Sequence, residues 1–299
     1  MKIVSVIPTH NRRLDIRQLC LMLRNANIPA ETVFEVVCVV DGSTDGTEEM
    51  LKEEFPEVRL IKGSGNWWYT KSMNEGIKYA LDHLAPDLIL CLNDDVELES
   101  NYLNNLVGAY KKVGGNCLMG SISLSIEQPY VISFSGTREE EKFPFRWIPY
   151  IKSLSAVDIS ELTGIYPSKE LPGRGMLVPS YILRELELLD EAFPQYHSDF
   201  DFCLRASRKG YKIYVSYDAV LYSHVMKTSS STTFKKISTI DFLKNFVNPY
   251  SRKHARQNAR YIWRHKNKLL FPFFFLKWLL LVVANHVRVN ISKPTTRGV

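Results

Sequence analysis

The sequence of 299 residues has few cysteines, and its acidic residues stop at Asp241. The five cysteines are scattered, without a CxxC pair or a Cys/His cluster of zinc-ligand spacing, so we expect reduced thiols in the cytosol and no zinc site. No positively charged leader precedes the first apolar run, and we therefore expect no secretory signal. Neither an internal repeat nor a low-complexity segment is present. What remains, at 45% hydrophobic residues, is enough for one sizeable core.

Charge divides the chain into two parts. Residues 1–241 hold all 32 Asp and Glu and 26 of the 38 Lys and Arg, a balance of −6. The other 12 Lys and Arg follow without a single acidic residue. We therefore predict a mildly acidic domain over 1–241 and a basic tail over 242–299, whose charge indicates an anionic partner.

The domain shows alternating patterns. Apolar runs at 2–7, 34–40, 57–62 and 87–92 alternate with helical patterns at 12–26, 45–54, 70–84 and 100–112. This order is typical of βαβ units around a parallel sheet and predicts an α/β fold. Further strands are expected at 117–124, 130–135, 212–216 and 219–224, further helices at 179–189 and 198–209, and a long surface excursion over 138–172.

The most informative stretch is Cys91–Glu97, where a strand-like apolar run ends in Asn93, Asp94 and Asp95. The carboxyl ends of strands are where open α/β sheets bind ligands. Carboxylate oxygens there suit a Mg²⁺ or Mn²⁺ ion that carries a diphosphate. The alternative is an acidic turn that caps the following helix.

Polar segments at other element ends occur in a characteristic order. Pro8-Thr9-His10-Asn11-Arg12 follows the first strand, Asp41-Gly42-Ser43 follows the second, and Ser198-Asp199-Phe200-Asp201 comes late in the domain. With the acidic strand end between them, residues 1–225 resemble the inverting GT-A glycosyltransferases of family two, of the bacterial rhamnosyl- and galactosyltransferase type. The resemblance implies a GT-A fold with a Rossmann-like, mostly parallel sheet. It also implies a UDP- or dTDP-sugar donor, a glycan or polyprenyl-linked acceptor in cell-surface polysaccharide synthesis, and Mn²⁺ or Mg²⁺ as cofactor.

The resemblance also implies roles on the donor side. The residues expected to bind the donor are Pro8, Thr9, Arg12 and Asp41 around the base, Trp67, Lys71 and Asn74 near the second glycine-rich turn, Asn93 and Asp94 at the acidic strand end, and Arg174 under the sugar. Asp95 is expected to bind the metal directly, and His224 is expected to add a late ligand. Each has a plainer interpretation: a tight turn for Asp41, core burial for Trp67 and a structural role for His224.

For catalysis, inversion needs a base that deprotonates the acceptor hydroxyl. Asp199 matches the position of the base in the family, with Asp201 as the second candidate. The alternative is an acidic first turn that only favours the helix dipole.

The tail combines a basic ridge with an apolar stretch. Arg252, Arg256, Arg260, Arg264 and Lys268 recur every four residues, and 269–287 has Lys277 as its only Lys, Arg, Asp or Glu. Pro272 and Lys277 disfavour a full membrane crossing. We expect a helix pair on the anionic inner face of the cell membrane, with packing against the domain or a second subunit as the alternative.

Two other functions remain to be weighed. Val40, Met73, Asn93 and Ser198 stand where the family usually has polar or charged groups, which would fit a non-catalytic nucleotide- or glycan-binding module on a degenerate scaffold. A nucleotidylyltransferase would need a glycine-rich phosphate loop after the first strand, which Pro8-Thr9-His10-Asn11 does not provide. A nucleic-acid partner is not favoured, because the Phe/Leu-rich run beside the basic ridge suits lipid better.

Overall fold

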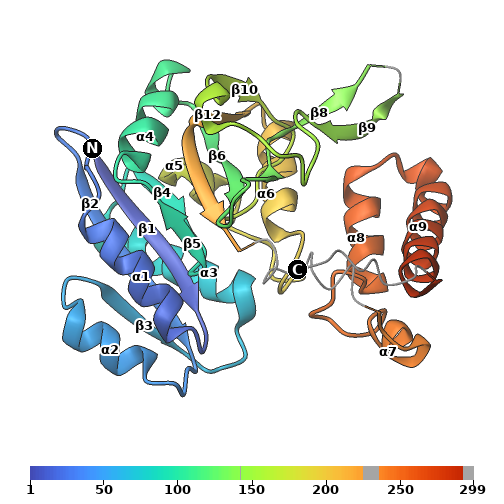
Figure 1. The fold of residues 1–299 in the computed structure, drawn as a ribbon, viewed down its shortest axis with the longest axis horizontal. Coiled ribbons are helices and arrows are strands. Elements are labelled where there is room, and N and C mark those ends of the chain that lie inside the picture. Colours follow the sequence, from blue (N-terminus) through green and yellow to red (C-terminus); the bar gives the residue numbers. More distant parts are fainter. Residues whose placement is uncertain (142, 225–235, 292–299) are drawn as a thin grey trace.

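The computed structural model describes residues 1–141, 143–224 and 236–291 (Figure 1). The strands are β1 (Lys2–Thr9), β2 (Val33–Asp41), β3 (Arg59–Gly63), β4 (Leu88–Cys91), β5 (Val96–Leu98), β6 (Cys117–Ser125), β7 (Ile132–Phe134), β8 (Thr137–Glu140), β9 (Phe143–Pro149), β10 (Ile165–Pro167), β11 (Met176–Pro179) and β12 (Lys212–Ser223). The helices are α1 (Arg13–Arg24), α2 (Thr47–Glu54), α3 (Trp68–Tyr79), α4 (Tyr102–Lys112), α5 (Ser180–Glu185), α6 (Ser198–Arg208), α7 (Thr239–Lys244), α8 (Ala255–His265) and α9 (Phe271–Ile291).

One large sheet forms the centre, in the order β10-β12-β6-β11-β4-β1-β2-β3. β1 pairs in parallel with β2 and β4, while β11 runs antiparallel between β4 and β6. Successive side chains of a strand point to opposite faces, and the core is accordingly double. Helices α3, α5 and α6 cover one face, and α1, α2 and α4 cover the other. The predicted mostly parallel sheet with flanking helices is confirmed.

The first strand extends beyond the apolar run at 2–7 and continues through Pro8 to Thr9. Pro8 pairs with Val39 of β2, whereas the ladder to β4 ends at Val6 and Cys91. The carbonyl of Val6 accepts from Leu92 on the β4 side, so the backbone of Pro8, two residues on, faces the same side. Its missing N–H therefore removes no ladder bond.

Three other expectations need correction. The helix expected over 179–189 ends at Glu185, because Glu187 and Leu188 adopt left-handed φ values of 57° and 64°. The two strands expected over 212–224 form one strand, β12, with an irregularity between Ser216 and Val220. The excursion at 138–172 contains the β8–β9 ribbon and the edge strand β10.

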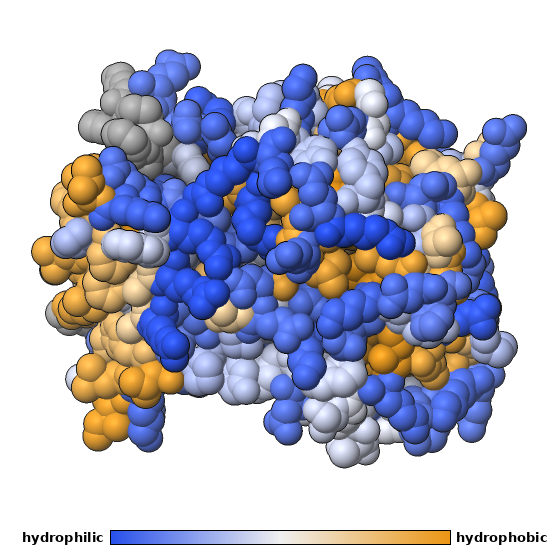
Figure 2. Space-filling model, turned by 180° about the vertical axis from the view of Figure 1, so that it is seen from behind, coloured by the Kyte–Doolittle hydropathy of each residue, from blue (hydrophilic) through white to orange (hydrophobic). Residues whose placement is uncertain are grey.

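The tail forms helices that stand beside the sheet domain (Figure 1). One side of α9 packs against α7 and α8 through ring contacts, such as Phe242 with His286 and Trp263 with Phe271. The other side is an apolar strip of Phe273, Leu276, Leu280, Val283 and Val287, each between 40% and 60% exposed. Their spacing of three and four residues puts them on one face. Orange atoms gather over this helix in Figure 2.

Candidate active site

The acidic strand end lies beside the end of β1, because β1 and β4 run parallel. Asp94 accepts hydrogen bonds from Thr9 Oγ1 at 2.7 Å and from Arg12 at 3.0 Å, and Asp95 accepts from the same Arg12 nitrogen at 2.8 Å. Burial raises the pKa of Asp94 to about 6. Arg12 thus bridges the two carboxylates, and its predicted contact with the nucleotide base stays a prediction.

Oxygen atoms suited to a divalent cation are present at this edge. The Oδ1 atom of Asn93 is buried and has no hydrogen-bond partner among the described residues, and Asp95 is nearly buried. Ser223 pairs with Val96, so His224 follows β12 opposite Asp95. Amide and carboxylate oxygens fit Mg²⁺ or Mn²⁺. Within the described ranges, however, no three Asp, Glu, His or Cys side chains converge as a ready metal cluster.

Asp41 holds the turn that precedes α3. Its carboxylate accepts the backbone N–H groups of Gly65 at 2.7 Å, Trp67 at 2.8 Å and Trp68 at 3.1 Å. A side chain at Gly63 would collide with this carboxylate, which explains glycine there. Both oxygens of Asp41 are therefore engaged by the protein, and its contact with a base stays a prediction.

The remaining donor-side residues divide into two kinds. Asn74 is buried and bonds to the backbone of Leu189 in both directions and to Glu191, which argues against a direct donor contact. Its amide instead ties α3 to the loop before α6. Lys71 lies over the ring of half-buried Trp67 at 5.5 Å, so this pair still presents a cation and a ring at the surface.

Asp199 lies in the first turn of α6 and is held by two backbone donors. Its carboxylate accepts from Gly173 N and from Phe200 N, each at 2.9 Å. Burial raises the pKa of Asp199, although the two bonds from the backbone oppose this effect. A carboxyl group with a raised pKa and room for a further hydrogen bond is suited to accept a proton.

Arg174 and Tyr69 lie in electrostatic reach of Asp199. Arg174 donates to Ser133 Oγ at 2.7 Å, but its Nε is buried without a partner among the described residues. The hydroxyl of Tyr69 is likewise buried without one, and a side chain at Gly173 would collide with it. Two unused donors beside a carboxylate indicate a polar site prepared for a ligand.

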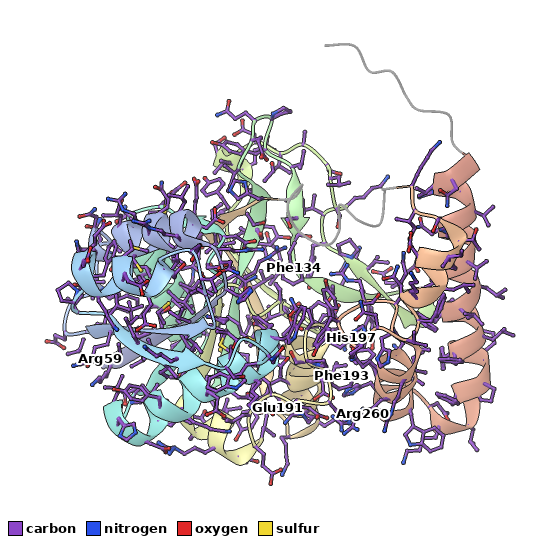
Figure 3. All side chains as sticks on the ribbon, turned by 90° about the horizontal axis from the view of Figure 1, so that it is seen from below. Arg59, Phe134, Glu191, Phe193, His197 and Arg260 are labelled. Atoms are coloured by element: carbon purple, nitrogen blue, oxygen red, sulfur yellow. The ribbon has the colours of Figure 1, made fainter. Side chains whose placement is uncertain are left out.

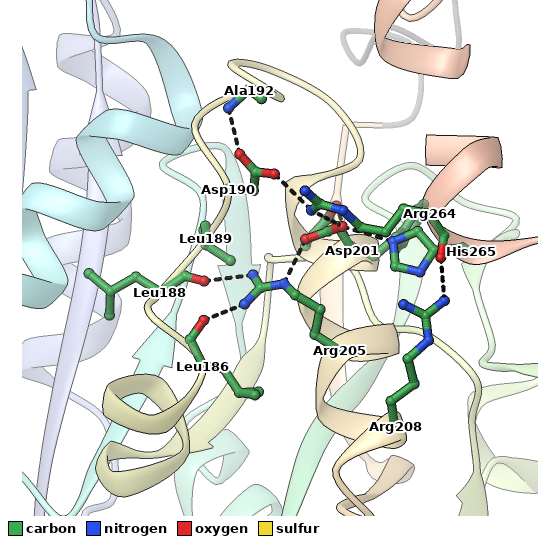
Figure 4. A network of polar contacts seen from close by, with 12 residues as sticks. Leu186, Leu188, Leu189, Asp190, Ala192, Asp201, Arg205, Arg208, Arg264 and His265 are labelled. Atoms are coloured by element: carbon green, nitrogen blue, oxygen red, sulfur yellow. Dashed lines mark hydrogen bonds and ion pairs between the residues drawn. The ribbon is translucent and has the colours of Figure 1, made fainter. Parts of the chain in front are cut away.

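Asp201, two residues further along α6, has a different environment. It is not exposed at all, and it accepts hydrogen bonds from Arg205, Arg264 and His265 at 2.7 to 2.8 Å (Figure 4). Burial alone would raise its pKa, but these three bonds outweigh burial and hold the pKa well below its usual range. A permanently charged, fully enclosed carboxylate argues against Asp201 as the base.

Glu170 is a part of the site that sequence reasoning missed, and the tail, whose packing against the domain was the alternative expectation, also reaches the site. Glu170 lies in the excursion, close enough to Asp199 to interact electrostatically, and burial raises its pKa to about 7. The tail residues Arg260 and Arg264 pair with Asp190, and Arg264 also pairs with Asp201. This part of the basic ridge therefore contacts the domain. The four-residue spacing located the ridge but not its partners.

Comparisons with known proteins agree with this geometry. Residues 5–158 match the model of the family described as glycosyl transferase family 2. The chain is 25% identical over 186 residues to the low-salt glycan biosynthesis hexosyltransferase Agl10 of Haloferax volcanii. That match covers 60% of this chain and just over half, 56%, of the relative.

Solved structures share the fold. GalNAc-T7, solved with UDP, GalNAc and Mn²⁺, has a TM-score of 0.61 at 13% identity, covering 96% of this chain and 58% of the other. Staphylococcus aureus TarS 1–349, solved with UDP-GlcNAc, has a TM-score of 0.55 at 15% identity, covering 97% of this chain and 90% of the other. At these identities the likeness is one of fold.

Proposed function

The chain belongs to glycosyltransferase family 2, and from this membership we propose that it transfers one sugar, with inversion, from a nucleoside-diphosphate donor to a glycan or polyprenyl-linked acceptor in cell-surface polysaccharide synthesis. The GT-A fold supports this proposal, and Arg174 lies in electrostatic reach of both Asp95 at the donor edge and Asp199, the candidate base. A UDP- or dTDP-linked donor is the class proposed.

The observation that carries the proposal is the difference in environment between Asp199 and Asp201, two acidic residues in the first turn of α6. Asp201 is held in its ionised form by three side-chain donors, whereas Asp199 has two backbone bonds and a raised pKa. Asp199 is therefore the group that can take the proton of an acceptor hydroxyl as that oxygen attacks the sugar. Arg174 and Tyr69 would orient the sugar through the donors that they leave unused.

On the donor side, Asp95 and the Asn93 amide oxygen would hold Mn²⁺ or Mg²⁺, with His224 as the further ligand. The ion, when bound, would neutralise the charge of the diphosphate leaving group. Arg12 would move from its bridge between Asp94 and Asp95 to the phosphates, since a guanidinium binds both kinds of oxyanion. Trp67 and Lys71 would border the nucleotide.

We further propose that the protein lies on the inner face of the cell membrane through α9 and the apolar side of α7. Ile240 and Leu243 of α7, and Val247 just after it, are between 59% and 75% exposed. The segment Lys268–Asn290 is also long and apolar enough to cross a membrane, by length and composition alone. A surface-bound helix is favoured because its other side already packs against aromatic rings of α7 and α8.

A donor-hydrolysis screen tests the enzymatic proposal. UDP-, dTDP- and GDP-sugars are incubated with the full chain, with and without Mn²⁺, and release of the nucleoside diphosphate is measured. We expect release from at least one UDP- or dTDP-sugar that requires Mn²⁺ and is lost in Asp199→Asn. Tight nucleotide binding without turnover of any donor, with or without a glycan acceptor, would support the non-catalytic binding module instead.

A further inference from the structure

The tail helix α8 docks on the turn that carries the proposed base. In Figure 4, Arg264 and His265 reach from α8 to the carboxylate of Asp201. The Arg264 guanidinium lies 2.7 Å from Asp201 Oδ1, and His265 Nε2 lies 2.8 Å from the same oxygen. Arg205, from α6 itself, takes the other oxygen at 2.8 Å. Two of the three donors to this buried acid thus come from the tail, more than 60 residues away.

The chemistry of this contact assigns different parts to the two tail residues. An ionised carboxylate can only accept, so His265 must carry its proton on Nε2. Burial lowers the pKa of His265, which keeps the ring neutral at pH 7. Arg264 therefore supplies the charge and His265 supplies a neutral donor. Arg264 also bonds to Asp190 at 2.7 Å, linking α8 to the loop before α6.

Helix α8 also contacts His197, which lies two residues before Asp199. The ring of Tyr261 stacks on His197 at 4.9 Å, and His197 has a left-handed φ of 75° where α6 begins. Phe193, His197 and Arg260 lie together at this boundary in Figure 3. Asp201 N donates to His197 O at 2.7 Å, which closes the first turn. Asp199 lies midway between two residues that α8 contacts.

We propose that Arg264 and His265 are positioning residues for transfer, acting through Asp201 to fix the first turn of α6 so that Asp199 faces the acceptor hydroxyl. The inference rests on the proposed function, in which Asp199 is the base. Arg264 and His265 touch neither the donor nor the acceptor in this arrangement. The tail is then a part of the active site as well as an anchor.

The expected effect follows from this indirect role. Moving a catalytic group by about 1 Å can lower a rate by about 10²-fold. Replacing Arg264 by Met should therefore lower kcat by about 10- to 100-fold while the affinity for UDP stays within about twofold. Without the guanidinium, the charge of Asp201 is less compensated and raises the pKa of nearby Asp199. The acidic limb of the pH–kcat profile, which is the pH range where kcat falls as Asp199 becomes protonated, should therefore move to higher pH.

The experiment uses the full chain and the sugar nucleotide with the highest hydrolysis rate in the donor screen, with water as acceptor. The kcat of Arg264→Met, Arg264→Lys, His265→Leu and His265→Gln is measured from pH 4 to 9, alongside UDP affinity by calorimetry. Arg264→Lys keeps the charge and should restore the position of the limb. His265→Gln keeps an N–H donor and should recover most of the kcat lost in His265→Leu. If Arg264→Met does not fold, Arg264→Gln, which removes the charge but retains an N–H, gives the same readout.

Arg256→Met is the matched control, since Arg256 is exposed on the same helix and lies outside the Asp190–Asp201 network. Wild-type kcat and an unmoved limb in folded Arg264→Met would overturn the inference, as would an equal loss in Arg256→Met. Loss of kcat in every variant without any movement of the limb and without rescue by Lys or Gln would reduce the contact to a structural one. An active Asp199→Asn, by contrast, would remove the proposed base itself.

Discussion

Helices α8 and α9 are neighbours in the sequence, but they turn their distinctive side chains in opposite directions. Arg260 and Arg264 of α8 reach inward to Asp190 and Asp201, whereas the apolar strip of α9 faces outward. A buried carboxylate is costly to leave without a compensating partner, and a continuous strip of exposed apolar side chains indicates a missing partner. One segment, basic and apolar by composition, thus contains one helix that packs on the sheet domain and one that we propose binds the membrane.

The largest effects are expected from substitutions of the two acids near α8, Asp199 and Asp201. We expect Asp199→Asn to lower transfer by about 10²–10⁴-fold with unchanged donor affinity, because the amide keeps the shape but cannot accept the proton. Asp201→Asn should lower transfer per folded molecule by about 10- to 100-fold, like Arg264→Met, because both changes release the first turn of α6. It should also lower stability, because removing one partner of a buried ion pair costs about 3–5 kcal/mol.

Turnover, UDP affinity and thermal unfolding of both variants check this pair. A dead Asp201→Asn beside an active Asp199→Asn would move the base two residues along and would give α8 a catalytic contact. Near-normal turnover in both would remove α6 from the mechanism.

Truncation separates the two helices directly. Removing 271–299 should lower binding to vesicles with anionic lipid by at least about 100-fold, since burying each large apolar side chain contributes about 1.5–3 kcal/mol. Donor hydrolysis should persist, because α8 remains. Removing 242–299 should release the protein from vesicles equally and also lower hydrolysis.

Vesicle co-sedimentation and donor hydrolysis are measured on both truncated chains. If the chain without residues 271–299 lost hydrolysis as completely as the chain without 242–299, α9 would also be required for catalysis. A full-length protein that ignores such vesicles but forms dimers would make the apolar strip a subunit interface.

The donor edge serves as a control region for tests of α8 and α9. Asp95 pairs there with Arg12, which lies at the start of α1. We expect chelation of divalent metal or Asp95→Ala to weaken UDP binding by at least about tenfold, since diphosphate and carboxylates repel one another without a cation. Truncation of α9 should leave this affinity unchanged. Calorimetry with UDP, with and without Mn²⁺, measures both effects, and equal affinity under all conditions would exclude Asp95 as a metal ligand.

A smaller effect concerns pH, where the two acids of α6 differ in sign. The raised pKa of Asp199 means that the base is protonated, and transfer lost, as pH falls through a value above the ordinary Asp pKa of about 3.9. The lowered pKa of Asp201 means that the stability from its bonds to α8 is fully present above the ordinary Asp pKa of about 3.9 and is lost only as the pH falls further, through the lowered pKa. A window of mild acid should therefore abolish transfer while α8 stays docked.

Donor hydrolysis and the near-ultraviolet circular dichroism of Tyr and Trp, followed over the same acid titration, locate the two transitions. If hydrolysis and the circular dichroism signal were lost at the same pH, the assignment of a raised pKa to Asp199 and a lowered pKa to Asp201 would be contradicted.

Much of the fold was predictable because it depends on local pattern. The apolar runs ending at Ile7, Val40 and Leu92 each lie within two residues of the end of a strand in the sheet. The polar residues that follow them necessarily meet at one edge, since β1, β2 and β4 run parallel. The order of these segments also carried the family resemblance, which the match over residues 5–158 confirmed.

What the sequence alone determined, then, was which residue types stand at strand and helix ends, because periodicity and turn chemistry act over a few residues. The tertiary structure decided their partners. Asp199 and Asp201 look alike in the sequence, but only Asp201 faces Arg264 and His265. Asn74, placed with the donor residues by its position, is enclosed by Leu189 and Glu191. Burial and ion pairing between distant segments set the pKa and accessibility of each group, and no spacing along the chain encodes which segments will pack together.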